Sequence, residues 1–402
     1  LVLNGGTPLA INANGAFTLG TGLVAGSAFT VAVGTQPAGQ TCTVTGGTGT
    51  VPAGGVVSAG VNCAGNMFAY VANFSTNNIS AYTINPSTGA LTEVAGSPFT
   101  AGDAPRSVTV DPSGKFAFVA NQNSGNVSAY TINTATGALT VVAGSSFAAG
   151  AGPLSVTVDP SGRFAYVANQ SSDNVSAYTI NTSTGALTPV AGSPFAAGTG
   201  PRSVTVDPSG KFAYVTNNGS DNVSAYAINA STGALTAVAG SPFESGDFPV
   251  SVTVDPSGQF AYVANAFTDN VSAYSIDPST GALTLVAASP FAAGAGPRSV
   301  TVDPSGKFAY VANTGTNNVS AYTINASTGA LTEVAGSPFS AGSGPIAVTV
   351  DPSGKFAYVA NQNSRNVSAY TINPVTGTLT PVAGSPFAAG TFPQSIVTVR
   401  PR

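Results

Sequence analysis

Residues 203–250 read SVTVDPSGKFAYVTNNGSDNVSAYAINASTGALTAVAGSPFESGDFPV, and this unit of forty-eight residues recurs through most of the chain. Its aromatic run, Phe-Ala-Tyr/Phe-Val, occurs seven times, starting at Phe68, Phe116, Phe164, Phe212, Phe260, Phe308 and Phe356. Its Asp-Pro-Ser-Gly turn recurs six times at the same spacing, at Asp111, Asp159, Asp207, Asp255, Asp303 and Asp351. A fixed period in this range predicts a repeat architecture in which the units share one core.

Each unit contains four strand-like runs. In one unit they are residues 155–158, 164–168, 174–180 and 186–190. The turn after the first run has Asp, Pro and Gly at the positions that a type I turn prefers. Four antiparallel strands in each of seven units predict an all-β fold, a seven-bladed β-propeller.

The ends of the repeat region predict how the ring closes. The first unit begins at its second strand, Phe68, and the chain ends with an extra first strand, Ser395–Val399. We therefore expect this last strand to pair beside residues 68–72 and to complete the first blade. All thirteen Tyr fall at two positions of the repeat. We predict that the tyrosine side chains pack between blades. The alternative is that they form a stacking platform for sugars or bases.

Composition excludes several classes of function. Charged residues are only 6% of the chain and the net charge is −4, so no basic surface favours a nucleic-acid partner. No apolar run is long enough for a membrane-spanning helix. The chain starts at Leu1 without a signal-peptide pattern, which suggests a mature or trimmed form.

The first 64 residues differ from the repeats and predict a small all-β module, followed by the propeller in residues 65–402. Its strand-like runs are residues 9–12, 16–19, 28–33, 41–44 and 56–62. Both cysteines, Cys42 and Cys63, lie here; they would form a disulfide in an oxidising compartment and remain two buried thiols in a cytosol. Through Asn14–Phe17 and Thr35–Val44 the module resembles Ig-like modules of secreted bacterial surface proteins. The resemblance implies a further strand before Leu1, so the module looks incomplete at its start.

The run Phe212–Asn217, with Asp207–Gly210 before it and Asn222–Tyr226 after it, resembles the YVTN family of β-propellers. That family is related to lactonase-type propellers and occurs in surface-layer proteins. The resemblance covers residues 68–399 and implies the fold, but its members include both enzymes and scaffolds.

Few residues suggest catalysis. The chain has no His, and no phosphate loop, Cys/His metal spacing or serine nucleophile motif is present. Lactonase-type relatives carry acidic, basic and often imidazole groups at the channel mouth, and no matching set is found. We therefore expect no enzyme, no cofactor and no metal.

Differences between the units mark one face as a candidate binding surface. The loops after the second strand and after the fourth strand vary, and in an up-and-down blade both fall on the same face. The candidate residues there are Arg106, Arg202, Arg298, Phe248, Phe267 and Arg365. The arginines are candidates for anion contact, with solvated rim charges as the alternative.

Two further sets of repeated residues have a structural and a functional interpretation. The Asp111-type carboxylates cap their own turns or bind cations. The Asn-Val-Ser and Asn-Ile-Ser runs match glycosylation acceptors or supply turn residues, at Asn78, Asn126, Asn174, Asn222, Asn270, Asn318 and Asn366.

The low charge of the surface favours contact with neighbouring molecules. The sequence thus predicts a non-catalytic, extracellular structural protein, a self-associating subunit of a surface layer, filament or adhesive assembly. A glycan- or peptide-binding propeller and a lactonase-like hydrolase are the alternatives.

Overall fold

A computed structural model of the protein describes residues 1–11, 15–37 and 40–401. The chain forms two compact units, Leu1–Asn66 and Met67–Arg402. Every regular element of the described residues is a β-strand, and no helix among them is long and apolar enough to cross a membrane.

The amino-terminal unit contains two small sheets. Strands β1 (Val2–Leu3), β2 (Ala28–Ala32) and β4 (Thr48–Thr50) form one sheet in the order β1-β2-β4, and β3 (Gln40–Thr45) pairs with β5 (Gly60–Gly65) in the other. Cys42 lies opposite Cys63 in the β3–β5 register, and the two form a disulfide.

The strands predicted for this unit are correct in part. Residues 28–33 and 41–44 match β2 and β3, but residues 9–11 and 16–19 form no strand, and Asn12 lies outside the described residues. The predicted run at residues 56–62 becomes a strand only from Gly60, where it meets its partner β3. Short apolar runs in this glycine-rich sequence therefore become strands only where a neighbouring strand supplies hydrogen bonds.

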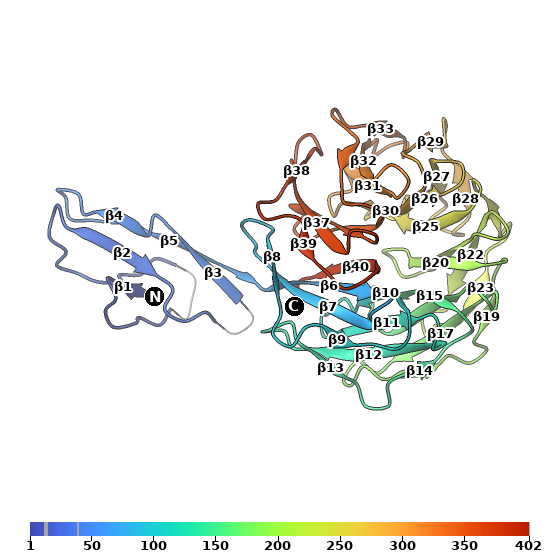
Figure 1. The fold of residues 1–402 in the computed structure, drawn as a ribbon, viewed down its shortest axis with the longest axis horizontal. Coiled ribbons are helices and arrows are strands. Elements are labelled where there is room, and N and C mark those ends of the chain that lie inside the picture. The colour runs from blue at the N-terminus through green and yellow to red at the C-terminus, as the bar shows by residue number, and fades with distance from the viewer. Residues whose placement is uncertain (12–14, 38–39, 402) are drawn as a thin grey trace. The chain divides into compact units, whose positions relative to one another are not determined.

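Met67–Arg402 forms the predicted propeller, whose seven sheets surround a common axis (Figure 1). We name the strands of each blade a to d from the axis outward, and e the short strand that pairs with c beside d. The a strands are β10 (Pro105–Val110), β15 (Pro153–Val158), β20 (Pro201–Val206), β25 (Pro249–Val254), β30 (Pro297–Val302), β35 (Pro345–Val350) and β40 (Pro393–Val399). The b strands are β6 (Met67–Asn73), β11 (Phe116–Asn121), β16 (Phe164–Asn169), β21 (Phe212–Asn217), β26 (Phe260–Asn265), β31 (Phe308–Asn313) and β36 (Phe356–Asn361).

The c strands are at least as long as the inner strands, and the d and e strands are short. The c strands are β7 (Asn78–Ile84), β12 (Asn126–Ile132), β17 (Asn174–Ile180), β22 (Asn222–Ile228), β27 (Asn270–Ile276), β32 (Asn318–Ile324) and β37 (Asn366–Ile372). The d strands are β8 (Leu91–Glu93), β13 (Leu139–Val141), β18 (Leu187–Pro189), β23 (Leu235–Ala237), β28 (Leu283–Leu285), β33 (Leu331–Glu333) and β38 (Leu379–Pro381). Each blade also has a two-residue e strand that the sequence did not predict: β9 (Phe99–Thr100), β14 (Phe147–Ala148), β19 (Phe195–Ala196), β24 (Phe243–Glu244), β29 (Phe291–Ala292), β34 (Phe339–Ser340) and β39 (Phe387–Ala388). Strand e pairs with the part of strand c that the short strand d leaves uncovered, as β19 does at Asn174 and Val175 of β17.

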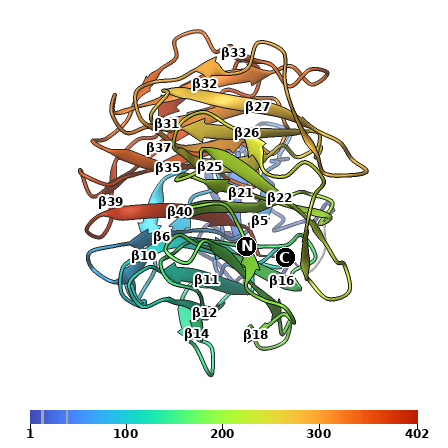
Figure 2. The same cartoon turned by 90° about the vertical axis from the view of Figure 1, so that its right-hand side faces the viewer.

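The ring closes as predicted. Strand β40 pairs antiparallel with β6, with Ser395 opposite Ala72 and Val399 opposite Phe68, so the last strand of the chain is the a strand of the first blade. Figure 2 shows the two strands as neighbours. Because strands from both ends of the repeat region share one sheet, the propeller has no open seam.

The core of the propeller lies between blades. Every residue of β6 is buried; Met67, Ala69 and Val71 contact the last blade, whereas Phe68 and Tyr70 contact the second. Successive side chains of a strand point to opposite faces, and here both faces are covered. This is why the b strands read as continuous apolar runs instead of alternating ones.

Tyrosine hydroxyl groups link the blades. The buried Tyr166 donates to the carbonyl of Gly233 in the turn between strands c and d of the next blade, at 3.0 Å. The second blade has Phe118 at this position and lacks the hydroxyl. Strand-c tyrosines make a second link, as Tyr226 does to the Ala196 carbonyl at 2.6 Å. The prediction that the tyrosines pack between blades is therefore confirmed.

The repeated aspartates cap their turns. Asp207 is buried and accepts from the backbone N–H groups of Ser209, Lys211 and Phe212, at 2.7–3.0 Å. These bonds occupy both carboxylate oxygens, so the structure favours turn capping over cation binding.

Candidate functional site

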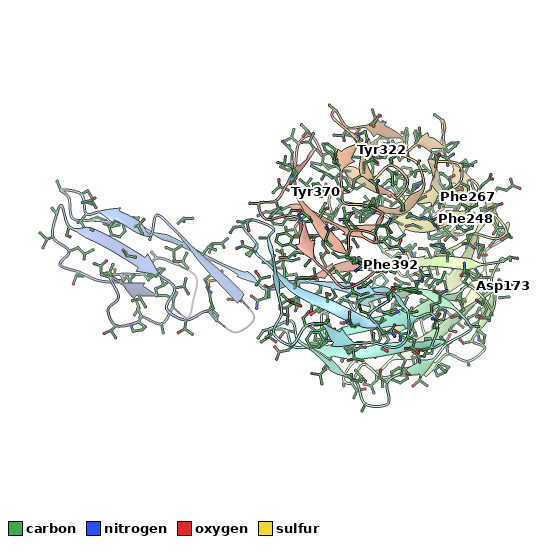
Figure 3. All side chains as sticks on the ribbon, viewed as in Figure 1. Asp173, Phe248, Phe267, Tyr322, Tyr370 and Phe392 are labelled. Carbon is green, nitrogen blue, oxygen red and sulfur yellow. A yellow bond between two sulfur atoms is a disulfide. The ribbon has the colours of Figure 1, made fainter. Side chains whose placement is uncertain are left out.

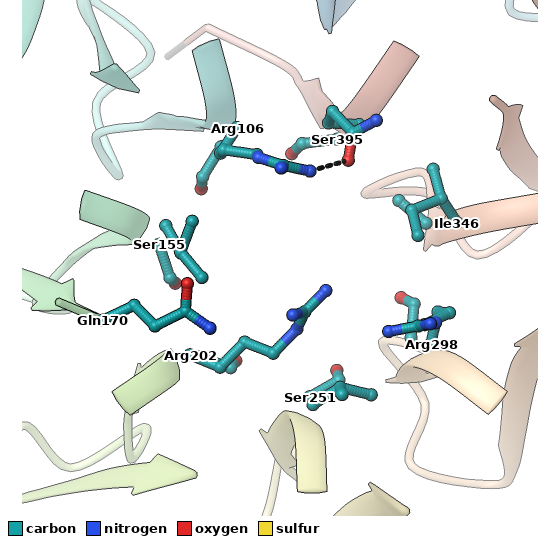
Figure 4. Close-up of a pocket in the computed structure, with 15 residues that line it drawn as sticks. Arg106, Ser155, Gln170, Arg202, Ser251, Arg298, Ile346 and Ser395 are labelled. Carbon is teal, nitrogen blue, oxygen red and sulfur yellow. Dashed lines mark hydrogen bonds between the residues drawn. The ribbon is translucent and has the colours of Figure 1, made fainter. Parts of the chain in front are cut away.

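A cavity of about 200 Å³ lies at the mouth of the central channel, where the a strands begin (Figure 4). The second residue of each a strand lines it, and these residues are Arg106, Leu154, Arg202, Val250, Arg298, Ile346 and Gln394. Because this position differs from blade to blade, near-identical blades build a cavity with chemically different sides. Three of the sides are arginines, the same three that the sequence singled out.

Arg106 is held by three neighbours. Its Nε donates to Gln122 Oε1 at 2.6 Å and its Nη1 to Gln394 Oε1 at 2.7 Å, and the second bond is the dashed line in Figure 4. Its guanidinium also lies over the ring of Phe74, 4.3 Å from the centroid. Burial, and after it the charge of Arg298, lowers the pKa of Arg106.

Arg202 and Arg298 are less completely paired. Within residues 67–401, neither donates a hydrogen bond to another residue, and the Nε of Arg298 is buried without a partner. Burial, then the charges of Arg298 and Arg106, lowers the pKa of Arg202 to about 9. Burial also lowers the pKa of Arg298. The cluster thus holds positive charges close together at a cost in free energy.

The described residues that line the cavity include no acidic side chain to neutralise the arginines. Six a strands contribute a serine instead: Ser107, Ser155, Ser203, Ser251, Ser299 and Ser395. Each serine oxygen accepts a backbone N–H from the next blade, as Ser155 does from Val204 at 3.2 Å. The hydroxyl protons remain available to a ligand in the channel.

The structure places the other candidates of this face in different surroundings. Phe248 and Phe267, labelled side by side in Figure 3, stack on each other with ring centroids 4.3 Å apart. Arg202 and Arg298 lie next to this stack. Arg365 is exposed and is not among the residues that line the cavity. It precedes Asn366, at the position where Asp173 and Asp221 cap the loop of the next blade.

Sequence reasoning missed three contributors to the site. Phe74 supports Arg106, Gln122 accepts from it, and Gln170 lines the cavity. All three lie in the loop between strands b and c, whose variability the sequence revealed. The contacts of Phe74 and Gln122 with Arg106, and the place of Gln170 at the cavity, need the folded geometry.

The glycosylation acceptors are partly enclosed. The serine of each such run, for example Ser176, is buried and accepts from the amide of Asn169, which also donates to Asn174. Modification of these asparagines, like the predicted self-association and glycan binding, stays a prediction. No group of three or more His, Cys, Asp or Glu side chains that could hold a metal occurs among the residues that the structure describes.

The geometry defines what the cavity can bind. Three guanidinium groups without an acidic partner favour a negatively charged ligand, because such a ligand supplies the missing counter-charge and hydrogen-bond acceptors. Developing negative charge on a reacting oxygen is stabilised in the same way.

Comparison with known proteins identifies relatives of the chain. A family model described as lactonase, 7-bladed beta-propeller, matches residues 38–152, 148–344 and 339–391. A search of curated proteins gave no match.

Solved structures with the same fold include two bacterial proteins. One, from Bacteroides uniformis and assigned as a 6-phosphogluconolactonase, is 21% identical over 83% of this chain and 99% of its own, with a TM-score of 0.74. The other, the periplasmic gluconolactonase of Pseudomonas aeruginosa, is 19% identical over 84% of this chain and 100% of its own, with a TM-score of 0.73.

These findings correct the expected function. The prediction of a non-catalytic structural protein, and of no enzyme, is wrong, because the family model points to a hydrolase. The prediction took near-identical blades and the lack of His as evidence against an active site. In the structure, one variable position per blade is enough to build an asymmetric cavity. By a match that extends over most of its length, the chain belongs to the family of seven-bladed β-propeller lactonases.

Proposed function

We propose that the protein is a lactonase-like hydrolase that opens lactones carrying a negatively charged group. One observation carries the proposal: Arg106, Arg202 and Arg298 converge on the channel mouth without an acidic side chain among the described lining residues. The phosphorylated lactone for which the Bacteroides protein is named has such a group.

The reaction needs little from the protein beyond positive charge. The oxygen of water adds to the lactone carbonyl carbon, the ring carbon–oxygen bond breaks, and the ring oxygen takes up a proton. The new carboxylic acid then ionises and releases one proton. Guanidinium N–H groups stabilise both the oxyanion that forms during the addition and the carboxylate of the product.

The lining residues also indicate the nucleophile. None of them carries an imidazole or a carboxylate, so we infer that water or hydroxide from the channel attacks without a side-chain base of the common types. Serine hydroxyls such as Ser203 and Ser251 donate to the substrate's oxygens and orient its ring.

The test is a measurement of proton release in a pH-stat with neutral and phosphorylated lactones. We expect kcat/KM at least about 10-fold higher for the phosphorylated lactones. Arg202→Gln should lower that value by about 10–100-fold. Arg365→Gln removes an arginine of the same face outside the cavity and should change it by less than about twofold. Hydrolysis no faster than in buffer for every lactone would refute the proposal, as would equal activity of Arg202→Gln and wild type.

We further infer an extracytoplasmic location. The Cys42–Cys63 disulfide supports it, because disulfides persist in oxidising compartments, and the Pseudomonas relative is periplasmic. Cell fractionation with thiol labelling tests this inference; a cytosolic protein with two reactive thiols would contradict it. The Ig-like assignment of the amino-terminal unit stays a proposal that its short strands support.

A further inference from the structure

One position in the loop between blades has the same unusual backbone in all seven repeats. It is the residue before the first proline of strand a, and its φ lies between 57° and 68° throughout. The residues are Ala104, Gly152, Gly200, Phe248, Gly296, Gly344 and Phe392. Glycine adopts this left-handed conformation without strain, whereas a bulky aromatic residue does so rarely. Phe248 and Phe392 are therefore outliers that call for an explanation.

The surroundings of Phe248 hold it firmly. Its backbone N–H donates to Asp221 Oδ1 at 2.8 Å. Its ring stacks on Phe267, with the centroids 4.3 Å apart and the planes 11° from parallel. Phe267 remains 68% exposed, although the equivalent positions of other blades are small or polar, as at Gly219. Two aromatic residues, of which Phe267 is unique among the equivalent positions and Phe248 recurs only at Phe392, thus build one stack.

The stack lies against the arginine cluster. The guanidinium carbons of Arg202 and Arg298 lie 5.9 and 6.0 Å from the centroid of Phe248. These arginines come from the blades on either side of the blade that Phe248 begins. Arg106 has its own ring, Phe74, at 4.3 Å. Every arginine of the cavity is therefore within cation–π distance of a phenylalanine.

We propose that Phe248 is a positioning residue that holds Arg202 and Arg298 in place for the anionic group of the substrate. The electron-rich ring attracts both cations, and it supplies this attraction without the acidic side chain that would compete with an anionic ligand. The proposal deepens the proposed function, since it rests on these arginines binding the substrate's charge. It also offers a reason for the unfavourable backbone at Phe248, since the ring at this position lies within 6.0 Å of both guanidinium groups.

Simple packing is the competing explanation. Phe248 is half-buried and packs on the apolar cluster around Phe260 and Tyr262. Leucine would fill that space at the same backbone cost but has no π face. Tyrosine keeps the π face. The two substitutions therefore separate positioning from packing.

The experiment measures binding of inorganic phosphate to the full chain by calorimetry. Phe248→Leu should raise Kd by about 3–10-fold, and Phe248→Tyr should stay within about twofold of wild type. Without the ring, the charged form of Arg202 is less stable, so the loss of binding at alkaline pH should begin at lower pH in Phe248→Leu. If Phe248 were only a packing residue, its replacement would not change the pH at which phosphate binding is lost.

Glycine variants add a control for backbone strain. In Phe248→Gly the relief of the positive φ is offset by loss of the ring's packing on the apolar cluster and on Phe267, so we expect no gain in the urea midpoint of unfolding. Phe392→Gly relieves the same φ at the equivalent position of the first blade. Only Phe248→Gly should weaken phosphate binding. Wild-type affinity in Phe248→Leu, or equal losses in Phe248→Leu and Phe248→Tyr, would overturn the proposal, and so would no phosphate binding by wild type. Phosphate binding that depends on Phe248 in a protein without lactone hydrolysis would remove the proposed reaction and leave the positioning role intact.

Discussion

Replacing Arg202 with glutamine should stabilise the protein while it weakens anion binding. Burial and two neighbouring positive charges lower the pKa of Arg202 from its ordinary, strongly basic range to about 9. Taken at face value, a shift of this size corresponds to roughly 5 kcal/mol of lost stability at neutral pH. The side chain is only half-buried by area, so solvent screens much of this, and we expect a gain of about 1–2 kcal/mol in the free energy of unfolding.

The pH dependence gives this effect a sign that can be checked. From about pH 9 up to the ordinary pKa of arginine, the unfolded chain keeps the proton of Arg202 while the folded chain loses it. The Arg202 contribution to the free energy of unfolding therefore rises with pH in this range. The advantage of Arg202→Gln should be largest below pH 9 and shrink above it.

Urea denaturation at several pH values measures the effect, with Arg365→Gln as the matched control. The control should unfold within about 0.5 kcal/mol of wild type, because an exposed arginine contributes little. An Arg202→Gln variant less stable than wild type at pH 7, or an advantage that grows above pH 9, would show that Arg202 is not destabilised by burial and by its positive neighbours.

Three further predictions follow from the same structure. Tyr166→Phe leaves the buried Gly233 carbonyl without its donor and should lower the free energy of unfolding by about 1–3 kcal/mol. Phe118→Tyr provides a hydroxyl for the equivalent Gly185 carbonyl and should raise the free energy of unfolding by about 0.5–1.5 kcal/mol. Urea denaturation measures both changes. Burial raises the pKa of the tyrosines, such as Tyr166, above their ordinary value of 10.0. Their contribution to the free energy of unfolding is therefore complete below pH 10 and is lost as pH rises. In an alkaline titration, tyrosinate absorbance should appear together with unfolding and not before it. The rate of lactone hydrolysis should rise with pH as the hydroxide concentration increases. Above about pH 9 the affinity of the protein for anionic substrates should fall, because Arg202 loses its charge there. A fall in affinity that begins below pH 7 would point to a different group.

The sequence predicts the propeller well because its pattern is physical and repeated. Four strands recur at a fixed spacing, and the extra strand Ser395–Val399 has only one place to pair. The e strands were not predicted because each has only two residues, such as Phe195 and Ala196, which are too few to show the hydrophobic alternation of a strand. Their pairing depends on where the short strand d leaves strand c uncovered.

The candidate site was predictable in its location but not in its chemistry. Differences between repeats pointed to Arg106, Arg202 and Arg298, because the loops of that face vary while the rest of each unit is nearly constant. What the sequence could not give is their convergence on one cavity, which follows from ring closure. The support from Phe74 also joins two blades and has no local signal. As long as that convergence is not known, the lack of His in the sequence favours a non-catalytic structural protein over an enzyme.

A crystal structure with the hydroxy-acid product of a phosphorylated lactone tests the central claim most directly. We expect the phosphate at the channel mouth, within hydrogen-bond distance of Arg202 and of at least one of Arg106 and Arg298. Product bound on the opposite face of the ring, or at the channel mouth without contact to any of the three arginines, would contradict it.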